Sequence, residues 1–542
     1  MRLAVVLPAL LLLALCFSPQ QSGAESVEAR LNQFNNIWRQ NPVEAFKVLK
    51  PVDSPKIVDF IVDIWYKFGN YGFFFEAAIE DALLTTQVGK PLDRLHYHMS
   101  NHDKAWMRAH MARISGRLAK PECRTKLLSA LKREATSEVI VVIIEALGSF
   151  NDPEVVNALM GCLGTGSRPE VRLVAVETLG MFKAASALST IVEMARKDNI
   201  EIRCAAIWSA AMIGGADADK VIIESMGSKD AVIRAAGAKS AAHVKGEEAM
   251  KALCALLEDP NWEVVSAAVR SLGMRGEIEA VPAIVNAMQK AKGRLIEDFQ
   301  NTLEIITKYK FGCDPKNWRE WLEESGGKPE VNPKPRPNET PYITFHKVQT
   351  RSLNMLFVID TSGSMNEKVK GTDAAKYLGE GAVLEGDTKL DFVKAELIRT
   401  INSLPPEAKF DIITFADDAA YWRGAQAPAD DRTKKSAVAH VKALVANGGT
   451  NVYGALQLAY GTMKQTTPHY PHDRNPDTIF LLSDGMPTVG DIIDPRQIHD
   501  IVTRLNKIRQ LVINTIGVGL EGEPFLKPLA EKNAGKYVRI AQ

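Results

Sequence analysis

Residues 354–365, NMLFVIDTSGSM, join a run of apolar side chains to a short polar turn. The apolar run MLFVI at 355–359 is unbroken, a pattern typical of a strand that is covered on both faces. Asp360, Ser362 and Ser364 follow it, each separated from the next by one residue. Because open α/β sheets bind ligands beyond the carboxyl ends of their strands, this stretch predicts both a buried strand and a site.

The sequence around this stretch alternates between two periodicities. Three more apolar runs, at 410–416, 478–483 and 511–519, predict further buried strands. Amphipathic stretches near 389–403, 433–446, 452–464, 495–509 and 523–533 predict helices. Strands that alternate with helices indicate a mostly parallel sheet with helices on both faces.

Two more polar turns complete the candidate site. Gly448-Gly449-Thr450 precedes a predicted helix, and Ser483-Asp484-Gly485 follows a predicted strand. With Asp360, Ser362 and Ser364, the residues Thr450 and Asp484 resemble the metal-ion-dependent adhesion site of the von Willebrand factor A (vWA) fold. The resemblance covers about 350–542 and implies an α/β doubly wound, Rossmann-like domain.

The resemblance also implies a ligand set and a partner. Ser362 and Ser364 are expected to ligate a divalent metal directly, and Thr450 directly or through water. Asp360 and Asp484 are expected to act largely through water. The implied cofactor is Mg²⁺ (or Mn²⁺ or Ca²⁺), hard cations that prefer oxygen ligands. The implied partner is a protein that supplies an acidic side chain to an open coordination position.

One segment departs from this family pattern. Residues 365–388 are longer than the few residues expected between Ser364 and the next helix. The sequence leaves two interpretations open, a lid or specificity loop beside the metal and a surface loop.

The middle of the chain repeats. Six segments start at Trp106, Glu138, Glu170, Glu201, Val232 and Glu263, at intervals of 31 or 32 residues. A small residue comes ten positions later in each, namely Gly116, Gly148, Gly180, Ala211, Ala242 and Gly273. We expect this residue to let one helix end and turn. An arginine lies two positions after four of the starts, at Arg108, Arg172, Arg203 and Arg234. The sequence leaves open whether these arginines bridge neighbouring repeats, cap carbonyls or are solvated.

These repeats resemble short HEAT-like repeats, in which stacked helix pairs share one continuous core. The predicted organisation is a multidomain chain in which an all-α HEAT-like solenoid precedes the vWA domain. The expected divisions are a helical N-terminal cap at 25–105, the solenoid at 106–325, a Pro-rich linker at 326–347 and the vWA domain at 348–542.

The N-terminus predicts export. Arg2 precedes an apolar run at 3–17, and Ser22-Gly23-Ala24 supplies small residues for cleavage, so 1–24 is interpreted as a signal peptide. The run is too short to span a membrane and contains Pro8. A bulky leucine before Cys16 disfavours a lipoprotein of bacterial type. The predicted location is extracytoplasmic, periplasmic or secreted, with no transmembrane span after cleavage.

Composition narrows the function. Among 542 residues the formal net charge is +1, so no nucleic-acid partner is expected. The sequence has no phosphate-binding loop and no nucleophile elbow, and Ser362 has no evident histidine partner, so we expect no enzyme activity. The predicted function is exported protein–protein interaction or adhesion, with the solenoid as a second binding surface. The alternative is a non-catalytic accessory or scaffold subunit of an extracytoplasmic enzyme complex. The oligomeric state is left open.

Overall fold

The computed structural model describes residues 25–68, 73–325, 342–369, 378–461 and 476–540. The predicted signal peptide, most of the predicted linker and the middle of the 365–388 insertion lie outside these ranges. The chain divides into two compact units, Met1–Phe68 with Ala77–Leu95, and Gly69–Glu76 with His96–Gln542. The first unit therefore ends ten residues before the predicted boundary at 105.

The first unit is helical and has an aromatic core. Its elements and those that continue from it are α1 (Val27–Trp38), α2 (Pro42–Ala45), a 3-10 turn (Phe46–Leu49), α3 (Pro55–Phe68), α4 (Phe73–Leu83) and α5 (Lys90–Asn101). Phe34 is fully buried, with the rings of Phe46 and Phe60 edge-on at 5.2 and 5.0 Å. Arg30 pairs with Asp53 at 3.0 Å and fixes the loop between α2 and α3.

The repeat region consists of paired helices. They are α6 (Ala105–Leu118), α7 (Pro121–Arg133), α8 (Ser137–Leu147), α9 (Pro153–Gly161), α10 (Pro169–Met181), α11 (Leu188–Lys197), α12 (Ile200–Ile213), α13 (Ala216–Met226), α14 (Ala231–Ser240), α15 (Glu247–Ala255), α16 (Trp262–Arg275), α17 (Val281–Met288), α18 (Leu295–Thr307) and α19 (Pro315–Ser325). Each of the six predicted repeat starts is the second residue of a helix, from Trp106 in α6 to Glu263 in α16. The predicted repeat period is therefore confirmed, and it sets where each helix begins.

Contrary to the prediction, most of the repeat glycines do not end helices but lie at contacts between helices. Gly116, Gly180 and Gly273 lie inside helices and face Ala146, Ser209 and Thr302 of the next repeat. A Cβ atom at Gly180 would lie 2.7 Å from the Cα of Ser209. The prediction that these glycines end helices is wrong, because they permit close helix–helix contact instead. Gly148 does cap the C-terminus of α8, as predicted.

The repeated arginines join neighbouring repeats. Arg108 pairs with Glu134 at 2.8 Å, Arg234 pairs with Asp259 at 2.7 Å, and Arg172 pairs with Asp198. Each acid lies just before the first helix of the following repeat, so the pair links one repeat to the next. Arg203 instead donates to the carbonyl of Ala195 at 3.0 Å. Both predicted roles, bridging repeats and capping carbonyls, are confirmed.

We predict that Gly180→Ala destabilises the repeat region. The added methyl group overlaps Ser209, and overpacking of a close-packed contact costs about 1–3 kcal/mol. The measurement is thermal unfolding of the full chain followed by circular dichroism, in which the midpoint of Gly180→Ala falls by several degrees. Gly166→Ala is the control, since a Cβ atom there has nothing within 4 Å. Equal midpoints for the two variants would contradict this role of Gly180.

The C-terminal domain is built on one mixed sheet with the strand order β5-β4-β3-β7-β8-β9 and with β6 paired to β4. The strands are β1 (Ile343–Phe345), β2 (Val348–Thr350), β3 (Asn354–Asp360), β4 (Lys409–Phe415), β5 (Ala419–Tyr421), β6 (Ala427–Pro428), β7 (Thr478–Ser483), β8 (Val512–Val518) and β9 (Tyr537–Ile540). From β4 to β9 the neighbours are parallel, and β5 and β6 join the edge antiparallel. The predicted mostly parallel α/β fold is confirmed.

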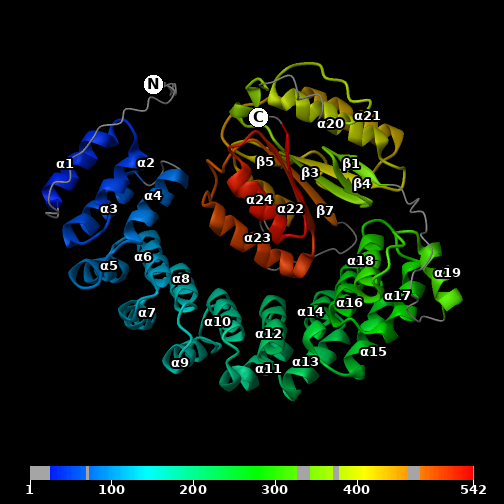
Figure 1. Ribbon diagram of the computed structural model, residues 1–542, viewed down its shortest axis with the longest axis horizontal. Coiled ribbons are helices and arrows are strands. Elements are labelled where there is room, and N and C mark those ends of the chain that lie inside the picture. Colours follow the sequence, from blue (N-terminus) through cyan, green and yellow to red (C-terminus); the bar gives the residue numbers. More distant parts are fainter. Residues whose placement is uncertain (1–24, 69–72, 326–341, 370–377, 462–475, 541–542) are drawn as a thin grey trace. The chain divides into compact units, whose positions relative to one another are not determined.

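Helices cover both faces of this sheet (Figure 1). They are α20 (Lys389–Ser403), α21 (Asp431–Ala443), α22 (Val452–Ala459), α23 (Pro495–Arg509) and α24 (Glu523–Lys532). Along β3 alternate side chains take opposite faces. Phe357 packs in the core shared with α20 and α21, and Leu356 and Val358 pack with α22, α23 and α24. The unbroken apolar run of β3 thus reflects burial on two sides.

The folded structure begins before the predicted domain boundary at 348. Strands β1 and β2 form a separate antiparallel pair, and Phe345 is fully buried in the core beside α20. Short strands of this kind show no periodicity of their own, which is why the sequence assigned 343–347 to the linker. Among the described residues, no helix is long and apolar enough to cross a lipid bilayer.

Candidate metal site

The site lies where β3 ends between its two parallel neighbours. The chain leaves β3 for β4 on one side and later reaches β7 on the other, so the sheet has its switch point here. Two backbone hydrogen bonds join the loop after β3 to the loop before α22. Gly363 N–H donates to Gly448 O at 2.9 Å, and Asn447 N–H donates to Thr361 O at 2.8 Å. The loops that carry Ser362 and Thr450 are therefore held side by side.

Asp360 is fully enclosed, with 0% of its surface exposed. Its carboxylate accepts from Ser362 N–H at 2.8 Å and from the Ser483 hydroxyl at 2.5 Å. Burial, assisted by the nearby Asp484 carboxylate, raises the pKa of Asp360 to about 6, although the hydrogen bonds from both serines favour the ionised form. The chain thus holds a carboxylate in a position where a cation would stabilise its charge.

The two predicted serines link Asp360 to Asp484. The hydroxyl oxygens of Ser362 and Ser364 lie 3.1 Å apart, and Ser364 donates to Asp484 Oδ1 at 2.8 Å. Four of the five predicted residues thus form one connected group. Thr450 is buried, and its N–H donates to Thr488 Oγ1 at 2.9 Å. Within the described chain no hydrogen bond joins the Thr450 hydroxyl to the other four residues.

Two residues that the sequence did not single out complete the site. Ser483 was part of the predicted turn, but only the fold shows that it reaches Asp360. Lys389, the first residue of α20, lies with its ammonium 2.7 Å from Asp484 Oδ2 and 2.8 Å from Glu367. Burial opposes the charge of Lys389, but its hydrogen bonds to Asp484 and Glu367 outweigh this and raise its pKa.

The position of Lys389 is notable because helix N-termini disfavour cations. The N-cap of α20 is Thr388, which forms a reciprocal capping box with Asp391. A lysine in the first helical turn therefore depends on Asp484 and Glu367 for its charge balance. It supplies a cation from the chain itself to one side of the carboxylate pair.

The donor set fits a hard divalent cation. Two carboxylates and up to three hydroxyls lie beyond the carboxyl ends of the central strands, and oxygen is the ligand type that Mg²⁺, Mn²⁺ and Ca²⁺ prefer. Neutral hydroxyls close to such an ion would leave it electrophilic. The described residues contain no group of three or more His, Cys, Asp and Glu side chains that is placed to hold a metal.

The comparisons with known proteins define the class. Residues 355–486 match the von Willebrand factor type A domain, and residues 92–173, 165–242 and 220–298 match HEAT repeats. The chain is thus a HEAT-repeat region followed by a vWA domain.

Among curated proteins, the chain is distantly related to heavy chains of the inter-alpha-trypsin inhibitor. It is 27% identical to heavy chain 4 of Mus musculus over 228 residues, which cover 40% of this chain and 21% of that protein. It is 28% identical to heavy chain H1 of Homo sapiens over 191 residues, 34% of this chain and 18% of that protein. The chain therefore spans about a fifth of the length of these relatives.

Among solved structures, a von Willebrand factor type A protein from Catenulispora acidiphila is 21% identical with a TM-score of 0.26. The match covers 36% of this chain and 40% of that one.

We predict that Lys389→Gln tightens the binding of Mg²⁺ by the full chain. Removing the ammonium beside Asp484 removes a repulsion, and unit charges 4 Å apart interact by about 4 kcal/mol near a protein surface. The Mg²⁺ concentration that gives half of the maximal thermal shift should fall by about tenfold or more. Lys409→Gln, an exposed lysine at the opposite end of β4, is the control and should leave that concentration unchanged. Weaker binding of Mg²⁺ by Lys389→Gln would contradict the idea that the Lys389 ammonium competes with the metal for Asp484.

Proposed function

We propose that this chain is an exported binding protein whose vWA domain recognises an acidic side chain of a partner protein through a divalent metal. The observation that carries the proposal is the connected group of Asp360, Ser362, Ser364 and Asp484 at the switch point of the sheet. The vWA match and the relationship to inhibitor heavy chains, which are by name chains of a protein inhibitor, support a role in protein binding. The proposed role is non-catalytic.

Each residue has a distinct part in this proposal. Ser362 and Ser364 offer hydroxyl oxygens as direct ligands, and Thr450 offers a third directly or through water. Asp360 and Asp484 balance the charge of the ion, largely through water. A bound Mg²⁺, Mn²⁺ or Ca²⁺ would supply an electrophilic coordination position for the partner's carboxylate. Ser483 orients Asp360, and Lys389 offsets the charge of Asp484 when no metal is bound.

The metal is the first part to test. MgCl₂ added to the full chain after EDTA treatment should raise the thermal midpoint by about 5–10 °C, because a ligand at a hundredfold excess over its Kd stabilises the folded state by about 2.7 kcal/mol. Asp360→Asn keeps the shape of the side chain but removes its charge, and it should abolish most of this shift.

A matched control separates the site from general charge effects. Glu407→Gln changes an exposed carboxylate just before β4, at the opposite end of the sheet, and should keep the full shift. A shift that persists in Asp360→Asn, or no shift in any of the proteins, would contradict a metal site formed by these residues.

The proposed export has a direct test. Cleavage after Ala24 removes the apolar run at 3–17, so the mature protein should begin at Glu25. Mass spectrometry of the N-terminal peptide, on protein taken from outside the cytoplasm of the producing cell, measures this. A protein that keeps residues 1–24, or that stays in the cytoplasm, would contradict the proposal.

A further inference from the structure

One position of the HEAT repeats forms a line of side chains toward α23. It comes seven residues after each repeat start, in helices α6, α8, α10, α12, α14 and α16. We call these residues the repeat column: Arg113, Glu145, Glu177, Trp208, Lys239 and Arg270. Residues 31 or 32 apart return to the same face of successive repeats, which is why the column is continuous.

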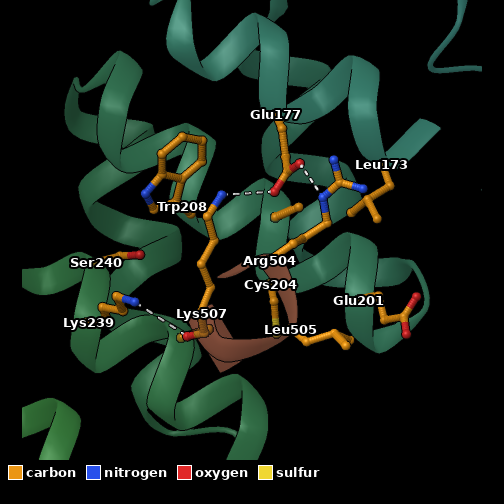
Figure 2. A pocket seen from close by; sticks show the side chains of 12 residues that line it. Leu173, Glu177, Glu201, Cys204, Trp208, Lys239, Ser240, Arg504, Leu505 and Lys507 are labelled. Atoms are coloured by element: carbon orange, nitrogen blue, oxygen red, sulfur yellow. Dashed lines mark hydrogen bonds and ion pairs between the residues drawn. The ribbon is translucent and has the colours of Figure 1, made fainter. Parts of the chain in front are cut away.

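The repeat column contacts the vWA domain mainly through α23. Arg504 lies 3.3 Å from Glu145 and 3.4 Å from Glu177, and Lys507 lies 3.1 Å from Glu177. The Lys507 ammonium also lies 4.5 Å from the centre of the Trp208 ring. Figure 2 shows both cations of α23 directed toward Glu177, with Trp208 beside Lys507.

The charges of the two surfaces match along part of the repeat column. Arg113 lies 3.8 Å from Asp494, the N-cap of α23. Lys239, further along the column, donates to the Lys507 carbonyl at 3.5 Å. That carbonyl lies in the last turn of α23, where a helix carries a partial negative charge. Arg113, Glu145 and Glu177 thus meet groups of opposite sign on α23. Lys239 instead meets a carbonyl, and burial together with the nearby Lys507 and Arg270 cations lowers its pKa to about 8.

The contact between the repeat column and α23 is incompletely packed. A cavity of about 130 Å³ remains between α10, α12, α14 and α23, lined in part by Leu173, Cys204 and Leu505. The Arg504 and Lys507 side chains stay 34% and 41% exposed. Exposed ion pairs are weak one by one and are screened by salt, so high salt should loosen this part of the contact. Glu177 itself is only 13% exposed, and beside the ion pairs Gln510 donates to the Glu263 carbonyl in a buried hydrogen bond of 3.0 Å.

We propose that the repeat column is a docking site for a helix that presents an arginine and a lysine three residues apart, and that α23 occupies this site within the chain. A partner helix with the same spacing of basic residues reaches the column only by displacing α23. Along this column, the solenoid that the sequence predicted as a second binding surface is already in contact with the vWA domain. The proposal is independent of the metal site.

Cys204 provides the readout in the full chain. Its thiol is free and buried, it lines the cavity beside Leu505, and burial raises its pKa to about 12. Alkylation with iodoacetamide, followed on the Cys204 peptide by mass spectrometry, reports release of α23. We expect Glu145→Lys with Glu177→Lys to speed alkylation at least tenfold, and the further changes Arg504→Glu and Lys507→Glu to restore slow alkylation.

The matched control is Glu138→Lys with Glu170→Lys. These exposed residues lie on the same helices, α8 and α10, and make the same change of charge. We expect this control to leave the rate of Cys204 alkylation unchanged, with native circular dichroism in every variant. The faster alkylation of Glu145→Lys with Glu177→Lys would then be due to the repeat column. Equal acceleration in both pairs, or none in Glu145→Lys with Glu177→Lys, would overturn the proposal.

A peptide tests docking from outside. In the full chain, Arg504→Glu with Lys507→Glu should repel the column glutamates and uncover the column, and a synthetic peptide of residues 495–510 is the probe. The peptide should slow Cys204 alkylation several-fold, and a peptide with both charges reversed should not. No protection by the natural peptide would contradict a docking site for basic helices. A last measurement needs no variant. Cys204 of the wild-type protein should be alkylated faster at 1 M NaCl than at 0.05 M NaCl, because salt screens the ion pairs between the repeat column and α23.

Discussion

The parallel pairing of β3 with β4 on one side and β7 on the other is the constraint on which the candidate site depends. It places the ends of β3 and β7 together, so that Asp360 and Asp484 meet although they are far apart in the chain. Burying a carboxylate without hydrogen bonds costs folding free energy. The hydrogen bonds that Ser362 and Ser483 donate to Asp360 offset this cost. The site is thus a direct result of strand order.

Repeat length has the same role in the first half of the second unit. An interval of 31 or 32 residues returns each helix to the same orientation, so a residue type at one position acts on the same neighbour every time. Arg108, Arg172 and Arg234 each reach the acid before the next repeat. The same regularity aligns Glu145, Glu177 and Trp208 against α23.

Sequence patterns predicted those features that depend on neighbours along the chain. The apolar run of β3, the repeat starts and the polar turns at Asp360 and Asp484 are local signals, and the fold keeps them. Features that depend on distant residues were not predictable. Lys389 has no distinctive sequence context, and its role exists only because α20 begins beside Asp484. Gly180 was misjudged because a glycine near a helix end has two uses, turning the chain or admitting a neighbour, and only Ser209 decides between them.

Both proposed binding surfaces share one electrostatic arrangement. Asp484 pairs with the ammonium of Lys389, and Glu177 pairs with the guanidinium of Arg504 and the ammonium of Lys507. In each case a carboxylate is balanced by a cation of its own chain. Such pairing avoids an uncompensated carboxylate in a partly buried position. It also sets the affinity of any outside cation, because the apparent Kd rises in proportion as the competent, open state becomes rarer. The two surfaces differ in what must move before an outside cation can bind. At the metal site the competing cation is the side chain of Lys389, whereas at the repeat column it belongs to α23, whose Ile498 and Val502 are buried in the vWA core. The first competition therefore needs only a side-chain movement, and the second needs the vWA domain to separate from the HEAT repeats.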